Sequence, residues 1–165
     1  MLLRELLLAA CAAAANRTLV GIGQLRAASG EPLRSKRVAA LVHAASAMPV
    51  SLVHTVDALV ADGVGLQAVL APEHGFRGDR QAEHGDPPSY IDNATGLTVF
   101  SVYRRNASAL QAILQEQAID VVLVDLQDAG TRLYTFVWTF YDLMAAAGGL
   151  AGPPTFLGPA RPNPP

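Results

Sequence analysis

The stretch Ile119-Asp120-Val121-Val122-Leu123-Val124-Asp125 decides the fold class of this chain. All of its residues are apolar except Asp120 and the closing Asp125, and most are β-branched, which favours an extended strand. A short strand without polar alternation is typical of a parallel sheet that is covered by helices on both faces. The run therefore predicts a central strand with Asp125 at its carboxyl end.

On either side of this run, strand and helix patterns alternate along the chain. We expect further strands over 36–42, 64–71, 97–102 and 154–157, and helices over 49–62, 107–117 and 133–147. Pro49 is suited to opening the first helix, and Gly148-Gly149 to ending the last. Repeated strand-helix-strand units predict an α/β fold, with a Rossmann-like, mostly parallel sheet and helices on both faces.

Two polar loops follow two of these strands. The first is Pro72-Glu73-His74-Gly75-Phe76-Arg77-Gly78-Asp79, and the second is Asp125-Leu126-Gln127-Asp128-Ala129-Gly130-Thr131-Arg132. In open α/β sheets, ligands bind outside the carboxyl ends of the strands. If the two strands are neighbours, we expect one crevice lined by Glu73, His74, Arg77, Asp125, Gln127, Asp128 and Arg132. Several carboxylates beside arginines can hold one acid protonated and another ionised, as acid/base catalysis requires.

Structural roles are the alternative interpretation of most of these residues. Asp128 is also suited to capping the helix that follows, and Arg77 and Arg132 to pairing with nearby acids. His43 and His54 lie on core-type segments, which favours a structural role for both. Three aromatic residues follow at helical spacing, which is typical of packing: Tyr134, Trp138 and Tyr141. Among them Tyr134 lies nearest the crevice and is the best candidate for contact with a sugar.

A metal site is a further alternative, because Glu73-His74-Gly75 is echoed by Glu83-His84-Gly85-Asp86. A metal-dependent hydrolase would use His74 and His84, whose imidazoles suit zinc. The spacing matches no established ligand motif, so we expect no metal. The segment after the first strand, His43 to Ala47, contains no glycine, which argues against a nucleotide-binding phosphate loop. We expect no cofactor.

Composition excludes other classes of protein. The chain has 165 residues, 51% hydrophobic and 16% charged, with a net charge of -2 and a single cysteine, Cys11. This balance is typical of a folded domain, and without a Lys/Arg cluster we expect no binding to nucleic acid.

The apolar stretch Leu6 to Ala15 is too short for a transmembrane segment but has the length of a signal-peptide core. Residues 1–16 therefore predict either an export leader, with a lipobox-like Cys11 as lipid anchor, or an N-terminal helix. An export leader would make the protein secreted or a lipoprotein, and otherwise it is cytoplasmic.

Four motifs in order resemble the exo-β-N-acetylmuramidase family, formerly a bacterial domain of unknown function. They lie at Ala71 to Asp79, at Tyr90 to Tyr103 (Tyr90-Ile91-Asp92 and Thr95 to Tyr103), at Val124 to Thr135, and at Arg161-Pro162-Asn163-Pro164. The resemblance implies a Rossmann-like catalytic domain over 17–165. It also implies hydrolysis of terminal, non-reducing N-acetylmuramic acid from peptidoglycan-derived sugars.

The resemblance further implies that Glu73 is the catalytic acid. Glycoside hydrolysis commonly uses a second carboxylate, for which Asp125 and Asp128 are candidates. Arg77 and Arg132 are candidates for pairing with the lactyl carboxylate of muramic acid. The other expected substrate-binding residues are His74, Asp79, Gln127 and Tyr134.

The chain also departs from the family pattern. Family members usually carry an Asn-x-Thr-Gly segment where this chain has His43-Ala44-Ala45-Ser46. The family continues beyond the position of Pro165 through more sheet and a second domain, so we expect a truncated version of the catalytic domain with an incomplete sheet. A non-catalytic or vestigial sugar-binding domain is therefore the alternative to a glycosidase.

Overall fold

The computed structural model describes residues 20–28, 30–81, 87–128 and 133–161. The strands are β1 (Val38–Val42), β2 (Leu66–Ala71), β3 (Ser89–Ile91), β4 (Thr98–Ser101), β5 (Val121–Asp125) and β6 (Thr155–Leu157). The helices are α2 (Gly21–Ala27), the short 3-10 helix η1 (Glu31–Leu33), α3 (Thr55–Ala61), α4 (Ala107–Glu116) and α5 (Phe136–Gly148). None of the helices within these ranges has the length and apolar character needed to cross a bilayer.

The six strands form one sheet in the order β3-β4-β2-β1-β5-β6. All neighbours pair in parallel except β3, which runs antiparallel to β4. The chain builds β2 and β4 on one side of β1 and then crosses to β5 and β6 on the other side. The sheet thus has a topological switch point between β1 and β5, where α/β proteins bind ligands. The predicted α/β, Rossmann-like class is confirmed.

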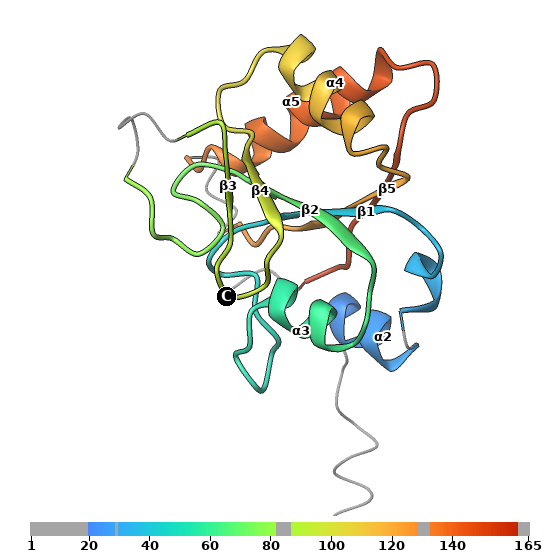
Figure 1. The fold of residues 1–165 in the computed structure, drawn as a ribbon. Coiled ribbons are helices and arrows are strands. Elements are labelled where there is room, and N and C mark those ends of the chain that lie inside the picture. Colours follow the sequence, from blue (N-terminus) through green and yellow to red (C-terminus); the bar gives the residue numbers. More distant parts are fainter. Residues whose placement is uncertain (1–19, 29, 82–86, 129–132, 162–165) are drawn as a thin grey trace, which may run out of the picture.

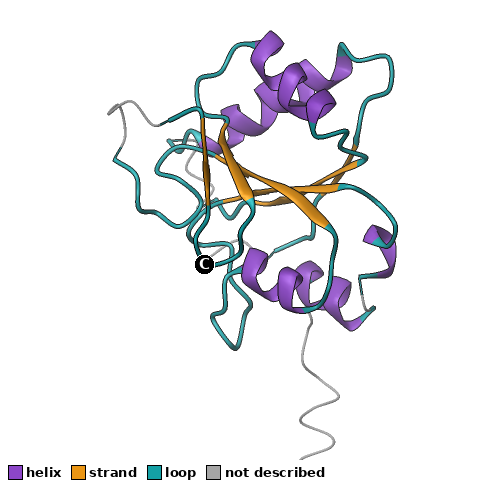
Figure 2. Ribbon diagram, in the orientation of Figure 1, coloured by secondary structure: helices purple, strands orange, loops and turns teal. Residues whose placement is uncertain are grey.

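Helices cover both faces of the sheet. In Figure 1, α2 and α3 lie on one side and α4 and α5 on the other, and Figure 2 shows the strands as a single layer between them. Side chains of β1 alternate between the two cores: Ala40 and Val42 face α2 and α3, whereas Ala39 and Leu41 face α4 and α5. Every residue of β1 and β5 is buried, which explains the continuous apolar run of β5.

The first predicted helix is wrong at its start. The expected helix began at Pro49, but α3 begins at Thr55, and the preceding His54 accepts the Val56 N–H with its side chain at 3.2 Å. Leu52 adopts a positive φ of 56° and is 78% exposed. Its helical spacing from the apolar residues of α3 is therefore accidental. The strand β3 lies between the expected strands 64–71 and 97–102, where the sequence predicted neither strand nor helix.

The predicted crevice assumed that the strands before the two polar loops are neighbours, and the observed strand order differs. The strands before the two polar loops, β2 and β5, are not neighbours, because β1 lies between them. Since all three run in parallel, their carboxyl ends still meet at one edge of the sheet. The segment after β1 therefore contributes to the crevice as well.

Candidate active site

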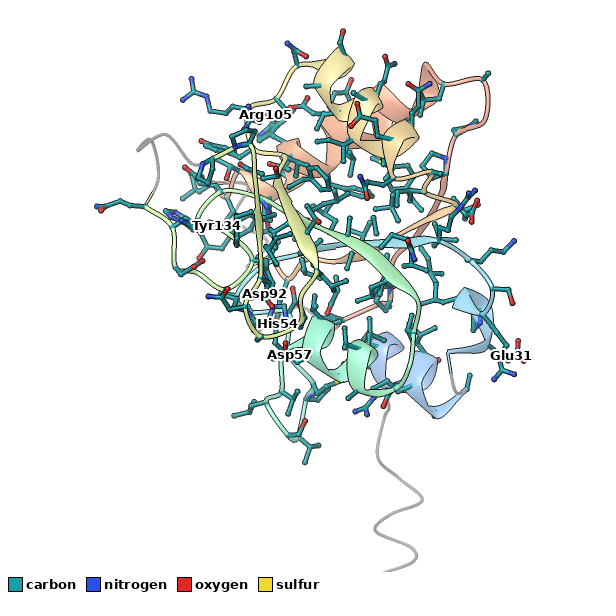
Figure 3. All side chains as sticks on the ribbon, in the orientation of Figure 1. Glu31, His54, Asp57, Asp92, Arg105 and Tyr134 are labelled. Atoms are coloured by element: carbon teal, nitrogen blue, oxygen red, sulfur yellow. The ribbon has the colours of Figure 1, made fainter. Side chains whose placement is uncertain are left out.

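A cavity of about 380 Å³ opens at the carboxyl edge of the sheet, at the switch point. Three segments line it, one after each of the central strands. They are His43, Ala44 and Ala45 after β1; Glu73, His74, Gly75 and Gly78 after β2; and Gln127 with Leu133, Tyr134, Thr135 and Phe136 after β5. Of the expected site residues, the structure brings together Glu73, His74, Gln127 and Tyr134. Tyr134 is half exposed and, in Figure 3, lies on the same side of the view as Asp92 and His54.

Glu73 is the one carboxylic acid among the described residues that line this cavity. It is half-buried, and the hydroxyl of Thr135 donates to its Oε2 at 2.6 Å. Thr135 precedes α5, whereas Glu73 follows β2, so this bond joins two walls of the cavity. The carboxyl group is thereby fixed in orientation, as a proton donor requires.

His74 adopts an unusual backbone conformation in the same wall. Its φ of 69° lies in the left-handed region, and the Gly75 N–H donates to the Pro72 carbonyl at 3.1 Å, which closes a tight turn. Position 74 is where such a turn normally carries glycine. The imidazole is exposed, and its Nδ1 lies 3.4 Å from the Arg80 carbonyl, too far for a strong hydrogen bond. A strained residue with an exposed side chain at a cavity wall is typical of a functional position.

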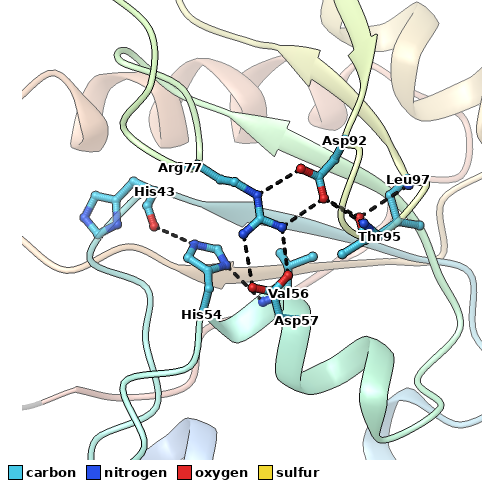
Figure 4. Close-up of polar contacts among 8 residues, drawn as sticks. All are labelled: His43, His54, Val56, Asp57, Arg77, Asp92, Thr95 and Leu97. Atoms are coloured by element: carbon cyan, nitrogen blue, oxygen red, sulfur yellow. Dashed lines mark hydrogen bonds and ion pairs between the residues drawn. The ribbon is translucent and has the colours of Figure 1, made fainter.

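Arg77 is held by two carboxylates rather than directed into the cavity. Its guanidinium donates to Asp92 through Nε and Nη2, each at 2.9 Å, and to Asp57 through Nη1 and Nη2 at 3.1 and 2.7 Å (Figure 4). Asp57 belongs to α3, and Asp92 follows β3. The hydrogen bonds from Arg77 lower the pKa of Asp57, and with those from Thr95 they hold the pKa of Asp92 at about 2. These contacts fix the loop that carries Glu73.

Asp125 is fully buried beneath the crevice and does not line the cavity. Arg161 donates to both of its carboxylate oxygens, the Nη2 contact measuring 2.7 Å, and the hydroxyl of Thr55 donates to Oδ2 at 2.6 Å. Asp128 is half-buried and is likewise not part of the cavity lining. Asp79 is exposed beside Arg80, with 3.8 Å between the charged atoms. Arg132, His84 and Cys11 lie outside the described residues.

His43 joins the loops after β1 and β5 across the switch point. Its Nε2 donates to the Gln127 carbonyl at 2.8 Å, and its Nδ1 lies 3.0 Å from the hydroxyl of Ser46, which in turn donates to the Asp125 carbonyl. The ring also meets Phe136 edge-on, with 4.7 Å between centroids. Next to it, His54 donates through Nε2 to the His43 carbonyl at 3.0 Å, and burial lowers the pKa of His54.

Among the lining residues that sequence reasoning did not assign to the site, three carry a hydrogen-bonding or aromatic side chain: His43, Thr135 and Phe136. His43 was interpreted as structural because its neighbours are apolar, although its position directly after a strand pointed to the carboxyl edge of the sheet. Thr135 lies in the predicted helix over 133–147, and nothing in the sequence distinguishes a threonine that faces a cavity from one that faces solvent or core. Among the residues with described placement, no group of three or more His, Cys, Asp or Glu side chains is arranged to hold a metal ion.

The fold and the cavity define a doubly wound α/β protein with a carboxylic acid at the switch point of its sheet. Residues 38–164 match the family model described as exo-β-N-acetylmuramidase NamZ, N-terminal. The chain belongs to this family, as the four sequence motifs predicted. It is similar to the peptidoglycan β-N-acetylmuramidase NamZ of Bacillus subtilis strain 168, with 37% identity over 146 residues, which cover 87% of this chain and 34% of that protein.

Two solved structures share the fold, both of them DUF1343 family proteins from Bacteroides fragilis NCTC 9343. BF0371 has a TM-score of 0.70 at 32% identity, and BF0379 has a TM-score of 0.64 at 28% identity. Each match covers 88% of this chain and 35% of the solved chain. The chain thus spans about a third of the length of the relatives that it matches.

Proposed function

We propose that this chain carries the terminal-sugar site of a glycoside hydrolase that releases non-reducing N-acetylmuramic acid from peptidoglycan fragments. The observation that carries the proposal is the placement of Glu73, half-buried in the cavity at the switch point and oriented by Thr135. Membership of the NamZ family supports the choice of sugar.

In this proposal Glu73 is the general acid. It gives its proton to the glycosidic oxygen as the bond from that oxygen to the anomeric carbon breaks. Water supplies the hydroxyl group of the released sugar, and the second carboxylate takes up the remaining proton of that water. His74 contacts the sugar from the same wall as Glu73, and Gln127 and Tyr134 contact it from the wall after β5. Asp128 is the candidate for the second carboxylate, and Arg132 for the partner of the lactyl carboxylate.

Two other candidates, Arg77 and Asp125, receive positioning roles in this proposal. Arg77 holds the loop of Glu73 through its pairs with Asp57 and Asp92, and Asp79 lies at the far end of the same loop. Asp125, whose two carboxylate oxygens are already bonded to Arg161 and Thr55, anchors the floor beneath the cavity.

A sugar-binding domain without turnover is the second candidate function. It is supported by the single carboxylic acid among the described lining residues, because both inverting and retaining hydrolases commonly use two. The two functions share the same ligand and differ in whether the glycosidic bond is broken.

The replacement Glu73→Gln tests both candidates. Gln keeps the size of the side chain and an oxygen that accepts from Thr135, but it has no proton to give. We expect the wild-type chain to release chromophore from a chromogenic N-acetylmuramide and Glu73→Gln to release none, with unchanged thermal unfolding. Binding of N-acetylmuramic acid in calorimetry without release by the wild type would favour the sugar-binding domain. Full activity of the variant would remove Glu73 from the acid role.

A further inference from the structure

Three aromatic side chains form an exposed row that leaves the cavity along α5. The row consists of Tyr134, Trp138 and Tyr141, which are 46%, 63% and 57% exposed. We expected Trp138 and Tyr141 to be packing residues, and their exposure shows that this interpretation is wrong, whereas Tyr134 was expected to contact sugar. The core side of α5 is instead formed by Thr139, Leu143, Ala146 and Ala147.

The row begins at the cavity. Tyr134 lines the cavity, and Phe136, at the first turn of α5, contacts Tyr134 with 5.8 Å between ring centroids. Trp138 lies on the next part of the helix and meets Tyr141 edge-on at 6.3 Å. Residues three apart on a helix share a face, so these two rings present one surface to the solvent.

We propose that this row is a binding subsite for the second sugar of the glycan, the one joined to the sugar held in the cavity. The inference rests on the proposed function for the identity of the first sugar. The apolar C–H face of a pyranose ring stacks on flat aromatic side chains, and tyrosine and tryptophan add polar groups that suit a wet surface. A chain whose terminal sugar occupies the cavity must leave it along one wall. Among the described walls of the cavity, the α5 wall is the one that carries exposed aromatic rings.

Two further exposed residues of α5 provide a way to distinguish this occupant from a protein partner. Val137 and Met144 are also exposed on α5, at 48% and 38%, and a protein partner would use them together with the aromatic residues. A sugar would use the rings alone. Replacing Met144 therefore provides a matched control on the same helix.

Trp138 is the single tryptophan of the chain, so its fluorescence reports on the row directly. The test uses the Glu73→Gln chain, which binds sugar without cleaving it, and titrates N-acetylmuramic acid and the β-1,4-linked N-acetylmuramyl-N-acetylglucosamine disaccharide separately. We expect the disaccharide to change the Trp138 emission and the monosaccharide to leave it unchanged. By calorimetry, Tyr141→Ala and Trp138→Ala should each weaken disaccharide binding by roughly tenfold, which corresponds to about 1.4 kcal/mol, and Met144→Ala should leave it unchanged.

The possible outcomes separate the subsite from the proposed function. Equal affinity for both sugars, with no response of Trp138, would overturn the subsite while leaving the cavity assignment in place. If neither sugar binds, both are overturned. A Trp138 emission that depends on protein concentration without sugar, together with a loss of that dependence in Met144→Ala, would show that the face docks a second copy of the chain instead.

Discussion

His74 shows how a single residue of the cavity can oppose the stability of the fold. Left-handed backbone angles cost a non-glycine residue about 1 kcal/mol, and the imidazole has one long contact, to the Arg80 carbonyl, among those recorded for it. The chain therefore keeps a strained histidine at a position where glycine would be relaxed. This cost is understandable if the side chain contacts the substrate.

The variant His74→Gly should consequently be more stable and bind less sugar. We expect its free energy of unfolding in urea to rise by up to about 1 kcal/mol, because glycine adopts the left-handed angles without a steric penalty. We expect its affinity for N-acetylmuramic acid to fall in calorimetry. His74→Ala removes the imidazole but keeps the strain, so it should lose affinity without gaining stability. Unchanged affinity in both variants would show that His74 does not contact the sugar.

At the scale of elements, Arg77 connects three parts of the molecule that the sequence separates. It lies on the loop after β2, Asp57 lies on α3, and Asp92 lies in the turn between β3 and β4. Both carboxylates are more than ten residues away in sequence, and nothing in the local pattern indicates which acid an arginine will meet. Sequence reasoning predicted that Arg77 either binds substrate or stiffens the loop, and the contacts favour stiffening.

The Asp92 contact should make the stability of the fold depend on acid pH. Its pKa falls from 3.8 to about 2 because Arg77 donates to the ionised carboxylate. A lowered pKa in the folded state adds stability above pH 4, which is lost as the pH falls through 2. For the well-buried Asp92 this amounts to roughly 2 kcal/mol. We expect the difference in unfolding free energy between wild type and Asp92→Asn to be largest above pH 4 and to shrink toward pH 2.

Asp120 provides the control for that measurement. Hydrogen bonds from Arg37 also hold its pKa at about 2, but this pair is exposed. Salt weakens interactions between exposed charges much more than those between buried charges, so the effect of Asp120→Asn should shrink in concentrated salt, and that of Asp92→Asn should persist. A pH-independent difference between wild type and Asp92→Asn would contradict the assignment.

At the scale of the whole molecule, most strands and helices could be predicted from the sequence, α2 and β3 excepted, but the order of the strands in the sheet could not. The apolar run of β5 and the periodicity of α4 are local signals, and both elements were predicted within two residues of their observed ends. Strand order depends on crossovers, so the insertion of β1 between β2 and β5 had no local signal. Because β1 lies between β2 and β5, the segment after β1, which includes His43, reaches the cavity. The sequence alone did not show that β1 takes this central place, so it did not indicate His43 as a site residue.

The two ends of the described chain meet near the floor of the cavity. Gly21 donates its N–H to the Ala160 carbonyl at 2.8 Å, and a side chain at position 21 would lie only 2.4 Å from the Ala160 nitrogen. The next residue, Arg161, pairs with the buried Asp125 of β5, to which Thr55 at the start of α3 also donates. One carboxylate thus connects the central sheet, a helix and the last described segment.

Removing this carboxylate should destabilise the whole fold rather than only the chemistry. Asp125→Ala leaves the guanidinium of Arg161, which is 12% exposed, without its partner. We expect a loss of about 3–5 kcal/mol in unfolding free energy, as for other broken buried ion pairs, measured by urea unfolding with Trp138 emission. Replacing both residues, in Asp125→Ala with Arg161→Met, should recover part of that loss because no unpaired charge remains buried. A purely catalytic Asp125 would behave differently. Asp125→Asn would abolish activity, and the unfolding free energies of Asp125→Asn and Asp125→Ala would both stay within about 1 kcal/mol of the wild type.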